Sequence, residues 1–162
     1  DRPRRTQAVV AAAFDMIYSD IVTRRINDPS RDFPGDVQAI ADDECIMAAE
    51  ARAKAVPESE VRSYVATLQS HGISRAFVVV IHPSHLPLPR PELRNWAWSA
   101  HRVVLDILES AADLVWAVLT WSRFSIEEVL QNLPARVRFR LREIEAEQES
   151  IMTWDRFFEE ST

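Results

Sequence analysis

The chain has 162 residues and a formal net charge of −6, and 47% of its residues are hydrophobic while 27% are charged. This composition is ordinary for a soluble globular protein. The negative charge argues against a simple basic nucleic-acid-binding module, though not against an enzyme whose carboxylates hold metal beside DNA. No apolar run reaches the roughly 18 residues of a membrane span, and the first residues show no signal-peptide pattern. The single cysteine, Cys45, excludes an internal disulfide and agrees with a reducing, cytoplasmic location.

The sequence is expected to form a single domain over 1–162. Its core would cover about 6–108, followed by a helical C-terminal part over about 109–162. The first residue is Asp1 rather than Met, as in an excerpt of a longer chain or a processed product. Only 2 glycines occur, at positions 35 and 72, so each is expected where backbone freedom matters.

The first predicted element is a helix over 6–26, because apolar residues recur along it at helical spacing. Residues 27–30 are expected to end this helix, since they contain a proline and residues that favour turns. A turn at 33–35 then leads to a predicted strand over 36–40, which is rich in apolar residues.

The polar residues 42–44 are expected to reverse the chain into a second strand over 45–54. The many alanines of this segment favour a helix by propensity alone. The alternation favours a strand, because Glu50, Arg52 and Lys54 would share one face with alanines on the other. We expect a strand, since the two runs on either side of 42–44 make a plausible hairpin.

A second predicted helix over 57–71 begins near Pro57 and ends at Gly72, which are common residues at these two ends. The segment 76–81 is the clearest strand of the chain, because it is a continuous apolar run rich in β-branched residues. Such a run predicts a strand that is buried on both faces. A proline-rich loop over 83–91 follows.

Two interpretations fit residues 92–121. Apolar residues spaced alternately by four and three would make one long helix. Alternatively, the segment forms a helix over 92–101, a strand over 103–108 and a helix over 110–121 that is capped by Ser110. We favour the second interpretation, because it continues the alternation of helices and strands.

Towards the C-terminus, Ser125 and Glu128 make a capping box that opens a short predicted helix over 126–132. A proline can then open a last helix over 134–149. Arginines that alternate with apolar residues over 136–142 are also typical of a strand, so this segment has two interpretations.

These elements predict a protein of the α/β class, with an α+β mixed sheet flanked by helices and a helical C-terminal half. A hairpin followed by a helical crossover to a buried strand produces such a sheet. The alternative is an all-helical adaptor, in which 92–121 is one helix and the alternation at 50–54 is accidental.

Acidic residues occur on both strands of the predicted hairpin, with Asp36 at the start of the first and Glu50 on the second. If the strands pair, both carboxylates can project from one face, where they repel each other unless a cation lies between them. Oxygen ligands of this kind suit Mg²⁺. A cationic side chain beside them, such as Arg52 or Lys54, can orient a water molecule or stabilise charge at phosphorus.

A resemblance to a known family rests on Pro34-Gly35-Asp36, on Glu50-Ala51-Arg52-Ala53-Lys54 and on the downstream segment HGISRAFVVV. These segments resemble the PD-(D/E)xK nuclease superfamily, and most of all the SacI family of restriction endonucleases. The resemblance covers roughly residues 6–82. It implies a restriction-endonuclease-like core and a type II-like restriction endodeoxyribonuclease of phage defence. Such an enzyme hydrolyses double-stranded DNA with Mg²⁺, or Mn²⁺ in its place, as a homodimer.

The resemblance also assigns roles to single residues. Asp36 and Glu50 would be the metal ligands, joined by the main-chain carbonyl of Ala51. The superfamily has lysine two residues after the acid, whereas this chain has Arg52 there and Lys54 two residues further on. Either Lys54 reaches back to serve the attacking water, or Arg52 fills the position as a permanent charge, since arginine is a poor general base. A third interpretation is a degenerate site in a non-catalytic DNA- or protein-binding domain.

Overall fold

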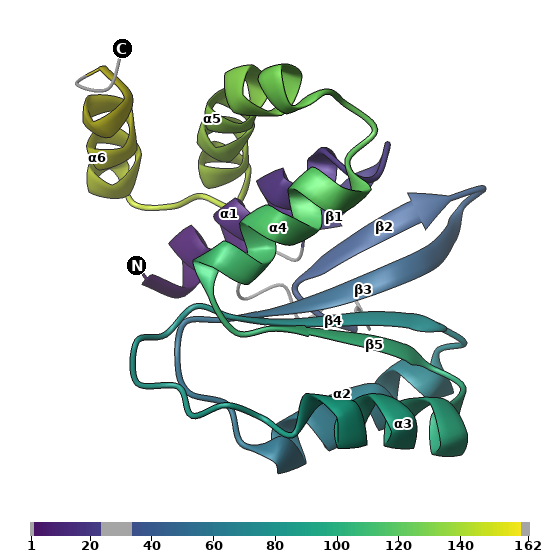
Figure 1. The fold of residues 1–162 in the computed structure, drawn as a ribbon. Helices are drawn as coiled ribbons and strands as arrows, with labels where there is room; N and C mark the ends of the chain where they lie inside the picture. The colour runs from purple at the N-terminus through teal and green to yellow at the C-terminus, as the bar shows by residue number, and fades with distance from the viewer. Residues whose placement is uncertain (1, 24–33, 160–162) are drawn as a thin grey trace.

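The structure is a computed structural model that describes residues 2–23 and 34–159 (Figure 1). Within these residues the strands form one sheet in the order β1-β2-β3-β4-β5. The elements in chain order are α1 (Arg2–Asp15), β1 (Ile21–Thr23), β2 (Val37–Ala41), β3 (Glu44–Arg52), α2 (Glu58–Ser70), β4 (Arg75–Val80), α3 (Arg90–His101), β5 (Val104–Leu108), α4 (Ala111–Trp121), α5 (Ile126–Glu143) and α6 (Gln148–Glu159).

The sheet is mixed, because β1, β2 and β3 are antiparallel neighbours while β3, β4 and β5 run parallel. Helix α2 makes the crossover from β3 to β4, and α3 makes the crossover from β4 to β5. This arrangement confirms the predicted α/β class with a restriction-endonuclease-like core and excludes the all-helical alternative. The parallel strands all end at the same edge of the sheet, on the left in Figure 1.

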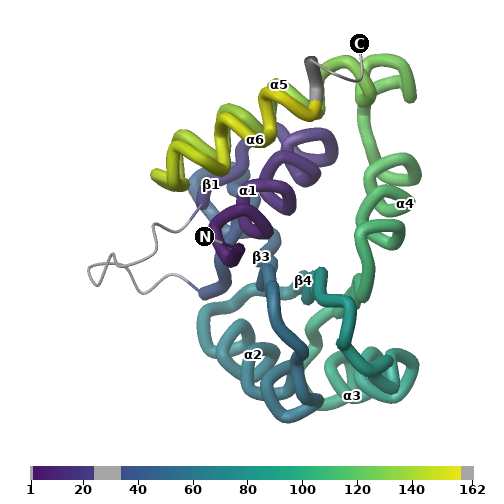
Figure 2. Tube along the Cα trace, turned by 90° about the vertical axis from the view of Figure 1, so that its left-hand side faces the viewer, coloured from purple at the N-terminus to yellow at the C-terminus, as the bar shows by residue number. Residues whose placement is uncertain are grey.

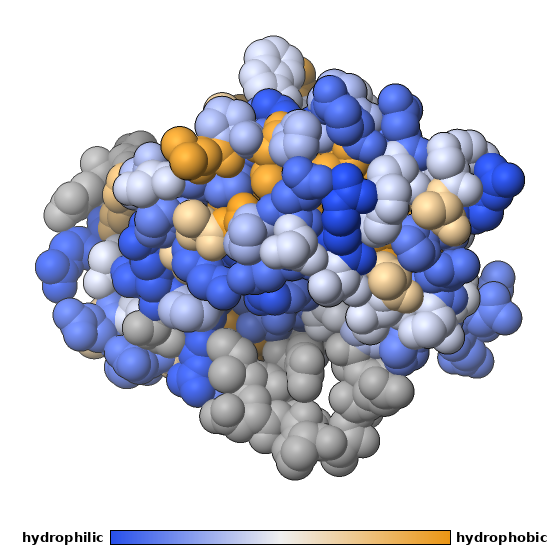
Figure 3. Space-filling view, turned by 90° about the horizontal axis from the view of Figure 1, so that it is seen from below, coloured by the Kyte–Doolittle hydropathy of each residue, from blue (hydrophilic) through white to orange (hydrophobic). Residues whose placement is uncertain are grey.

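Helices cover both faces of the sheet. On one face Phe77 and Val79 of β4 pack in a core with Phe14 of α1 and with α4. On the other face Val78 and its alternate neighbours in β4 pack against Val65 of α2 and against α3. Successive side chains of a strand point to opposite faces, so the apolar run of β4 fills both cores, as predicted. The outer surface on the α2 and α3 side is mostly hydrophilic (Figure 3).

The C-terminal half is helical, and α5 and α6 lie against α1 on the side away from the sheet (Figures 1 and 2). Val137 and Leu141 of α5 and Ile151 of α6 are buried against Ala8 and Ala12 of α1. None of the described helices is both long and apolar enough to span a membrane.

The central hairpin and the split of residues 92–121 are confirmed. The reversal between β2 and β3 uses positive φ angles at Asp42 (51°) and Asp43 (62°), which a type I′ hairpin turn requires at both of its central residues. Arg102, directly after α3, adopts a left-handed conformation with φ 57° that ends the helix and leads the chain into β5. The Ser110 hydroxyl accepts the Asp113 N–H, which caps α4 as predicted.

The predicted helix over 6–26 is wrong at its end, because α1 stops at Asp15 and residues 21–23 form β1. The three β-branched residues of β1 pair with β2, where Ile21 lies opposite Ala39 and Thr23 opposite Val37. Strand pairing therefore outweighs the helical spacing of the apolar residues. Residues 24–26 of the predicted helix lie outside the described residues.

The prediction for the C-terminal segment is also wrong, because one helix, α5, runs through Pro134 and ends at Glu143. A proline inside a helix removes one hydrogen bond. Burial of Val137, Arg140 and Leu141 along one face of α5 compensates for that loss and excludes the strand-like interpretation of 136–142. Helix α6 was not predicted. It is attached to α5 by the Trp154 Nε1–H, which donates to the Pro134 carbonyl (3.1 Å).

Candidate active site

The fold brings Asp36, Glu50 and Arg52 to one place. Val37 pairs with Ala49 across the hairpin, so Asp36, just before β2, comes close to Glu50 on β3. Ala49 lies in the core on the α1 face, so the alternation of β3 turns Glu50 and Arg52 to the opposite face, which α2 covers.

One guanidinium joins the two carboxylates. Arg52 Nη1 lies 3.4 Å from Asp36 Oδ2, and Arg52 Nη2 forms an ion pair with Glu50 Oε1. The side chains of Asp36 and Glu50 are 24% and 15% exposed, so neither charge is fully solvated. Both acids therefore reach the same cationic group, as expected if the two paired strands project them from one face.

Backbone contacts fix Asp36 in this position. Its Oδ2 accepts the Ala51 N–H (2.9 Å), and its own N–H donates to the Ala49 carbonyl (2.8 Å). Gln7 from α1 donates to the Asp36 carbonyl (2.9 Å). The preceding Gly35 has φ +86°, and a Cβ there would lie 2.9 Å from the Ala49 carbonyl oxygen. The turn before Asp36 therefore needs glycine, as the sequence indicated.

Lys54 lies apart from the two acids. Strand β3 ends at Arg52, and Lys54 follows in a bend with an exposed side chain. Within the described part of the chain its ammonium pairs with Glu60 on α2 (3.3 Å) rather than with Asp36 or Glu50. The structure thus brings Arg52, but not Lys54, into contact with the carboxylates.

A further residue of the site, Tyr64 on α2, was not predicted to have a functional role. Its hydroxyl is buried and has no hydrogen-bond partner among the described residues. It would lie 3.0 Å from a Cβ on Gly35, and it lines a hollow of about 20 Å³ together with Glu50 and Arg52. Nothing in the sequence marked this hydroxyl, because its burial depends on how α2 packs on the sheet.

Burial raises the pKa of Tyr64 well above its ordinary value, and the negative charge of Asp36 raises this pKa further. Folded protein therefore keeps the phenol proton at a pH where the unfolded chain loses it. The free energy of unfolding should fall as the pH rises above about 10. A Tyr64→Phe variant should show a shallower fall, by up to about 1.4 kcal/mol per pH unit for one proton.

Urea unfolding of both proteins between pH 9 and 11.5 tests this expectation. Tyr18→Phe is the matched control, since burial also raises the pKa of Tyr18, though by less. If the free energy of unfolding of Tyr64→Phe falls with pH as steeply as that of the parent protein, the raised pKa of the buried Tyr64 hydroxyl is contradicted.

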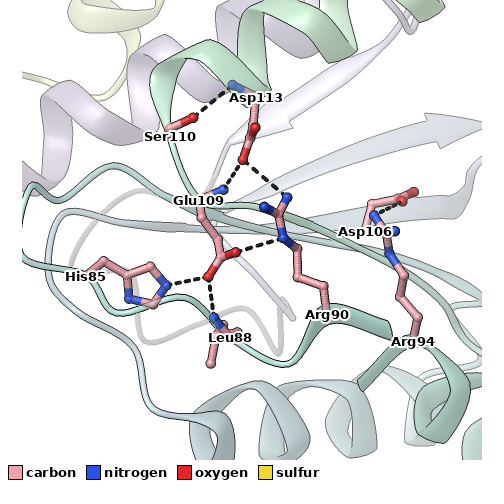
Figure 4. Close-up of polar contacts among 8 residues, drawn as sticks. All are labelled: His85, Leu88, Arg90, Arg94, Asp106, Glu109, Ser110 and Asp113. Atoms are coloured by element: carbon pink, nitrogen blue, oxygen red, sulfur yellow. Dashed lines mark hydrogen bonds and ion pairs between the residues drawn. The ribbon is translucent and has the colours of Figure 1, made fainter. Parts of the chain in front are cut away.

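A network of hydrogen bonds and ion pairs lies at the edge of the sheet where the parallel strands β3, β4 and β5 end (Figure 4). Glu109, directly after β5, accepts hydrogen bonds from the His85 ring (3.0 Å) and from the Leu88 N–H (2.6 Å) and pairs with Arg90 (2.8 Å). The other His85 ring nitrogen, Nδ1, accepts the Val56 N–H (3.4 Å). His85 is therefore tied into a structural network that fastens the proline-rich loop to the segment after β3.

The described residues contain no group of three or more histidine, cysteine, aspartate or glutamate side chains placed to hold a metal ion. A metal at the hairpin would therefore rely on the two carboxylates of Asp36 and Glu50. The main chain of Ala51, which lies against Asp36, and oxygens of the substrate or water would complete its ligands. This is the donor set that Mg²⁺ commonly takes.

Comparison with known proteins adds independent information. The chain matches no family model. It is 35% identical over 162 residues to the type II restriction enzyme SacI from Streptomyces achromogenes. The chain is a relative of a restriction enzyme. The match covers 99% of this chain, so it spans both the sheet and the helical C-terminal half, and this chain spans 45% of the length of SacI.

Proposed function

We propose that the chain is a metal-dependent DNA endonuclease of restriction type that hydrolyses phosphodiester bonds of double-stranded DNA. The observation that carries the proposal is the convergence of Asp36 and Glu50 on one cationic group at the hairpin. The 35% identity to a type II restriction enzyme supports the same reaction. Because the chain spans 45% of that relative, the activity of the whole relative is carried over as a proposal only.

We assign the metal to Asp36 and Glu50, with the Ala51 carbonyl as a third ligand, and Mg²⁺ as the ion, for which Mn²⁺ can substitute. The residues fit such an ion, because both carboxylates reach one shared cation; the role of the Ala51 carbonyl rests on the family resemblance. When bound, Mg²⁺ polarises a phosphate and makes a bound water more acidic.

The two cationic residues have different tasks in this proposal. Arg52 is permanently charged and half-buried beside the acids, so it suits the stabilisation of negative charge on the phosphate and not proton transfer. Lys54 lies two residues beyond the end of β3 on an exposed bend. Its assignment as the residue that serves the attacking water rests on the family resemblance, and it requires the ammonium to leave Glu60.

A homodimer belongs to the same proposal: the family resemblance implies it, and two such sites in one complex can cut both strands of double-stranded DNA. Restriction–modification and defence against phage would be the biological setting.

Digestion of supercoiled plasmid tests the function. With Mg²⁺ or Mn²⁺ we expect discrete fragments, and with EDTA we expect none. Fragments that also form in EDTA would contradict the role of metal. Absence of cutting together with absence of Mn²⁺ binding would contradict the proposal and favour a non-catalytic DNA- or protein-binding domain.

A further inference from the structure

We propose that Arg52 is a built-in counter-cation that competes with the divalent metal for Asp36 and Glu50 and so sets the metal affinity of the site. This inference rests on the proposed function, because it takes the two carboxylates to be the metal ligands. It adds a control of metal entry that the family resemblance does not imply, since the resemblance gives this position only a role towards water or phosphate.

The contacts of Arg52 carry the first step. Its Nη1 lies against Asp36 Oδ2 and its Nη2 against Glu50 Oε1, so the guanidinium takes one oxygen of each carboxylate. The three side chains are between 15% and 31% exposed. Water screens such half-buried charges incompletely, and two carboxylates in this setting need a positive charge nearby.

Competition follows from the charges that both cations need. Asp36 Oδ2 already accepts the Ala51 N–H in addition to its contact with Arg52. A divalent ion bound by both acids would draw on the same two negative charges that the guanidinium now neutralises, so the ion and Arg52 compete for them. Arginine stays charged at every physiological pH, so no change of pH removes this competitor.

Tyr64 supplies a second and independent observation. Its hydroxyl is buried in the hollow that Glu50 and Arg52 also line, and it lacks a partner within the described residues. A buried hydroxyl without a partner is costly and points to a partner in another state of the site. When a metal replaces the guanidinium, the Tyr64 hydroxyl can donate a hydrogen bond to a carboxylate oxygen that Arg52 no longer contacts. It can also bond to a water molecule bound to the metal.

Binding of Mn²⁺, measured by isothermal titration calorimetry or electron paramagnetic resonance, tests the inference without relying on cleavage. The variant Arg52→Gln should bind Mn²⁺ about tenfold more tightly than the parent chain, since a charge-assisted competitor is gone. In EDTA the same variant should melt at a lower temperature, because its two carboxylates lack a counter-charge, and Mn²⁺ should raise that melting temperature more than it does for the parent chain.

The matched control is Arg62→Gln, which breaks an ion pair with Glu58 on the surface of α2 and should leave Mn²⁺ affinity unchanged. A Glu50→Gln variant shows whether the binding belongs to the site. If Arg52→Gln binds Mn²⁺ no more tightly than the parent chain, while Glu50→Gln loses binding, the inference is overturned and the metal site stands. If no protein binds Mn²⁺, or Glu50→Gln binds it as the parent does, the metal assignment fails and the inference fails with it.

Discussion

Asp36→Asn and Glu50→Gln should each reduce DNA cleavage by about 100-fold or more. Loss of even an outer partner of a metal ligand commonly costs about 10- to 100-fold in metal affinity or activity, and these changes remove a charged ligand itself. Both substitutions are close in size to the native side chains, and an amide oxygen at position 36 can still accept the Ala51 N–H that holds it. The loss should therefore appear in the cleavage rate while the protein remains folded.

Matched controls lie on the same hairpin. Asp42→Asn and Glu44→Gln remove exposed carboxylates at the turn end, far along β3 from the site, and should cut DNA at the parent rate. Rates would be measured from the loss of supercoiled plasmid, and circular dichroism would confirm folding. If the site variants and the turn variants lose the same amount of cleavage activity, Asp36 and Glu50 affect cleavage only through the overall charge of the protein and do not bind metal.

Lys54→Met in the same assay separates the two cationic residues. If Lys54 serves the attacking water, the variant should cut at least about 100-fold more slowly, in the range expected for a lost proton-transfer group. A parent-like rate would leave Arg52, which contacts the acids directly, as the functional cation.

The hairpin and its acids could be predicted because several local signals agreed. The apolar run before 42–44, the polar reversal and the alternation after it all indicate two strands, and period-2 alternation alone places Glu50 and Arg52 on one face. The buried strand β4 was equally clear, since a continuous β-branched run leaves few alternatives. These features are encoded within a few residues of each other.

Features that depend on distant partners could not be predicted. β1 forms because it pairs with β2, and the residues Ile21–Thr23 alone do not indicate which strand they will pair with. α5 continues past Pro134 because α1 buries its apolar face. The position of Lys54 depends on where β3 stops, and the ends of elements are the least certain part of a sequence-based prediction. Likewise, the burial of the Tyr64 hydroxyl follows only from the packing of α2 on the sheet.

The largest expected effect on stability concerns Arg140, which ties α5 to the rest of the protein. Its guanidinium meets both carboxylate oxygens of Asp15 (2.6 and 2.9 Å), Glu143 (2.5 Å) and the carbonyl of Ile21 in β1 (2.9 Å). The side chains of Arg140 and Asp15 are 6% and 9% exposed. Burial lowers the pKa of Arg140, but hydrogen bonds to Asp15 and Glu143 outweigh this and leave the pKa raised.

Arg140→Met should lower the free energy of unfolding by about 3–5 kcal/mol, the usual cost of breaking a buried ion pair on one side. Asp15 would be left buried without its partner at the C-terminal end of α1, where the helix dipole also disfavours a negative charge. The matched control, Arg138→Met, also on α5, breaks the more exposed pair with Asp155 of α6 and should cost about 1 kcal/mol or less.

Urea unfolding measures both losses, and a double variant identifies their cause. Asp15→Leu combined with Arg140→Met removes the unpaired charge together with its partner, so it should recover much of the lost stability. If the double variant is as unstable as Arg140→Met alone, the unpaired charge of Asp15 is not the cause of the loss. The loss then comes from the hydrogen bond to the Ile21 carbonyl and from packing, since the pair with the more exposed Glu143 is expected to contribute little. In that case Arg140 stabilises the protein mainly by holding β1 against α5. Strand β1 is the neighbour of β2, which is the first strand of the hairpin that carries the candidate site.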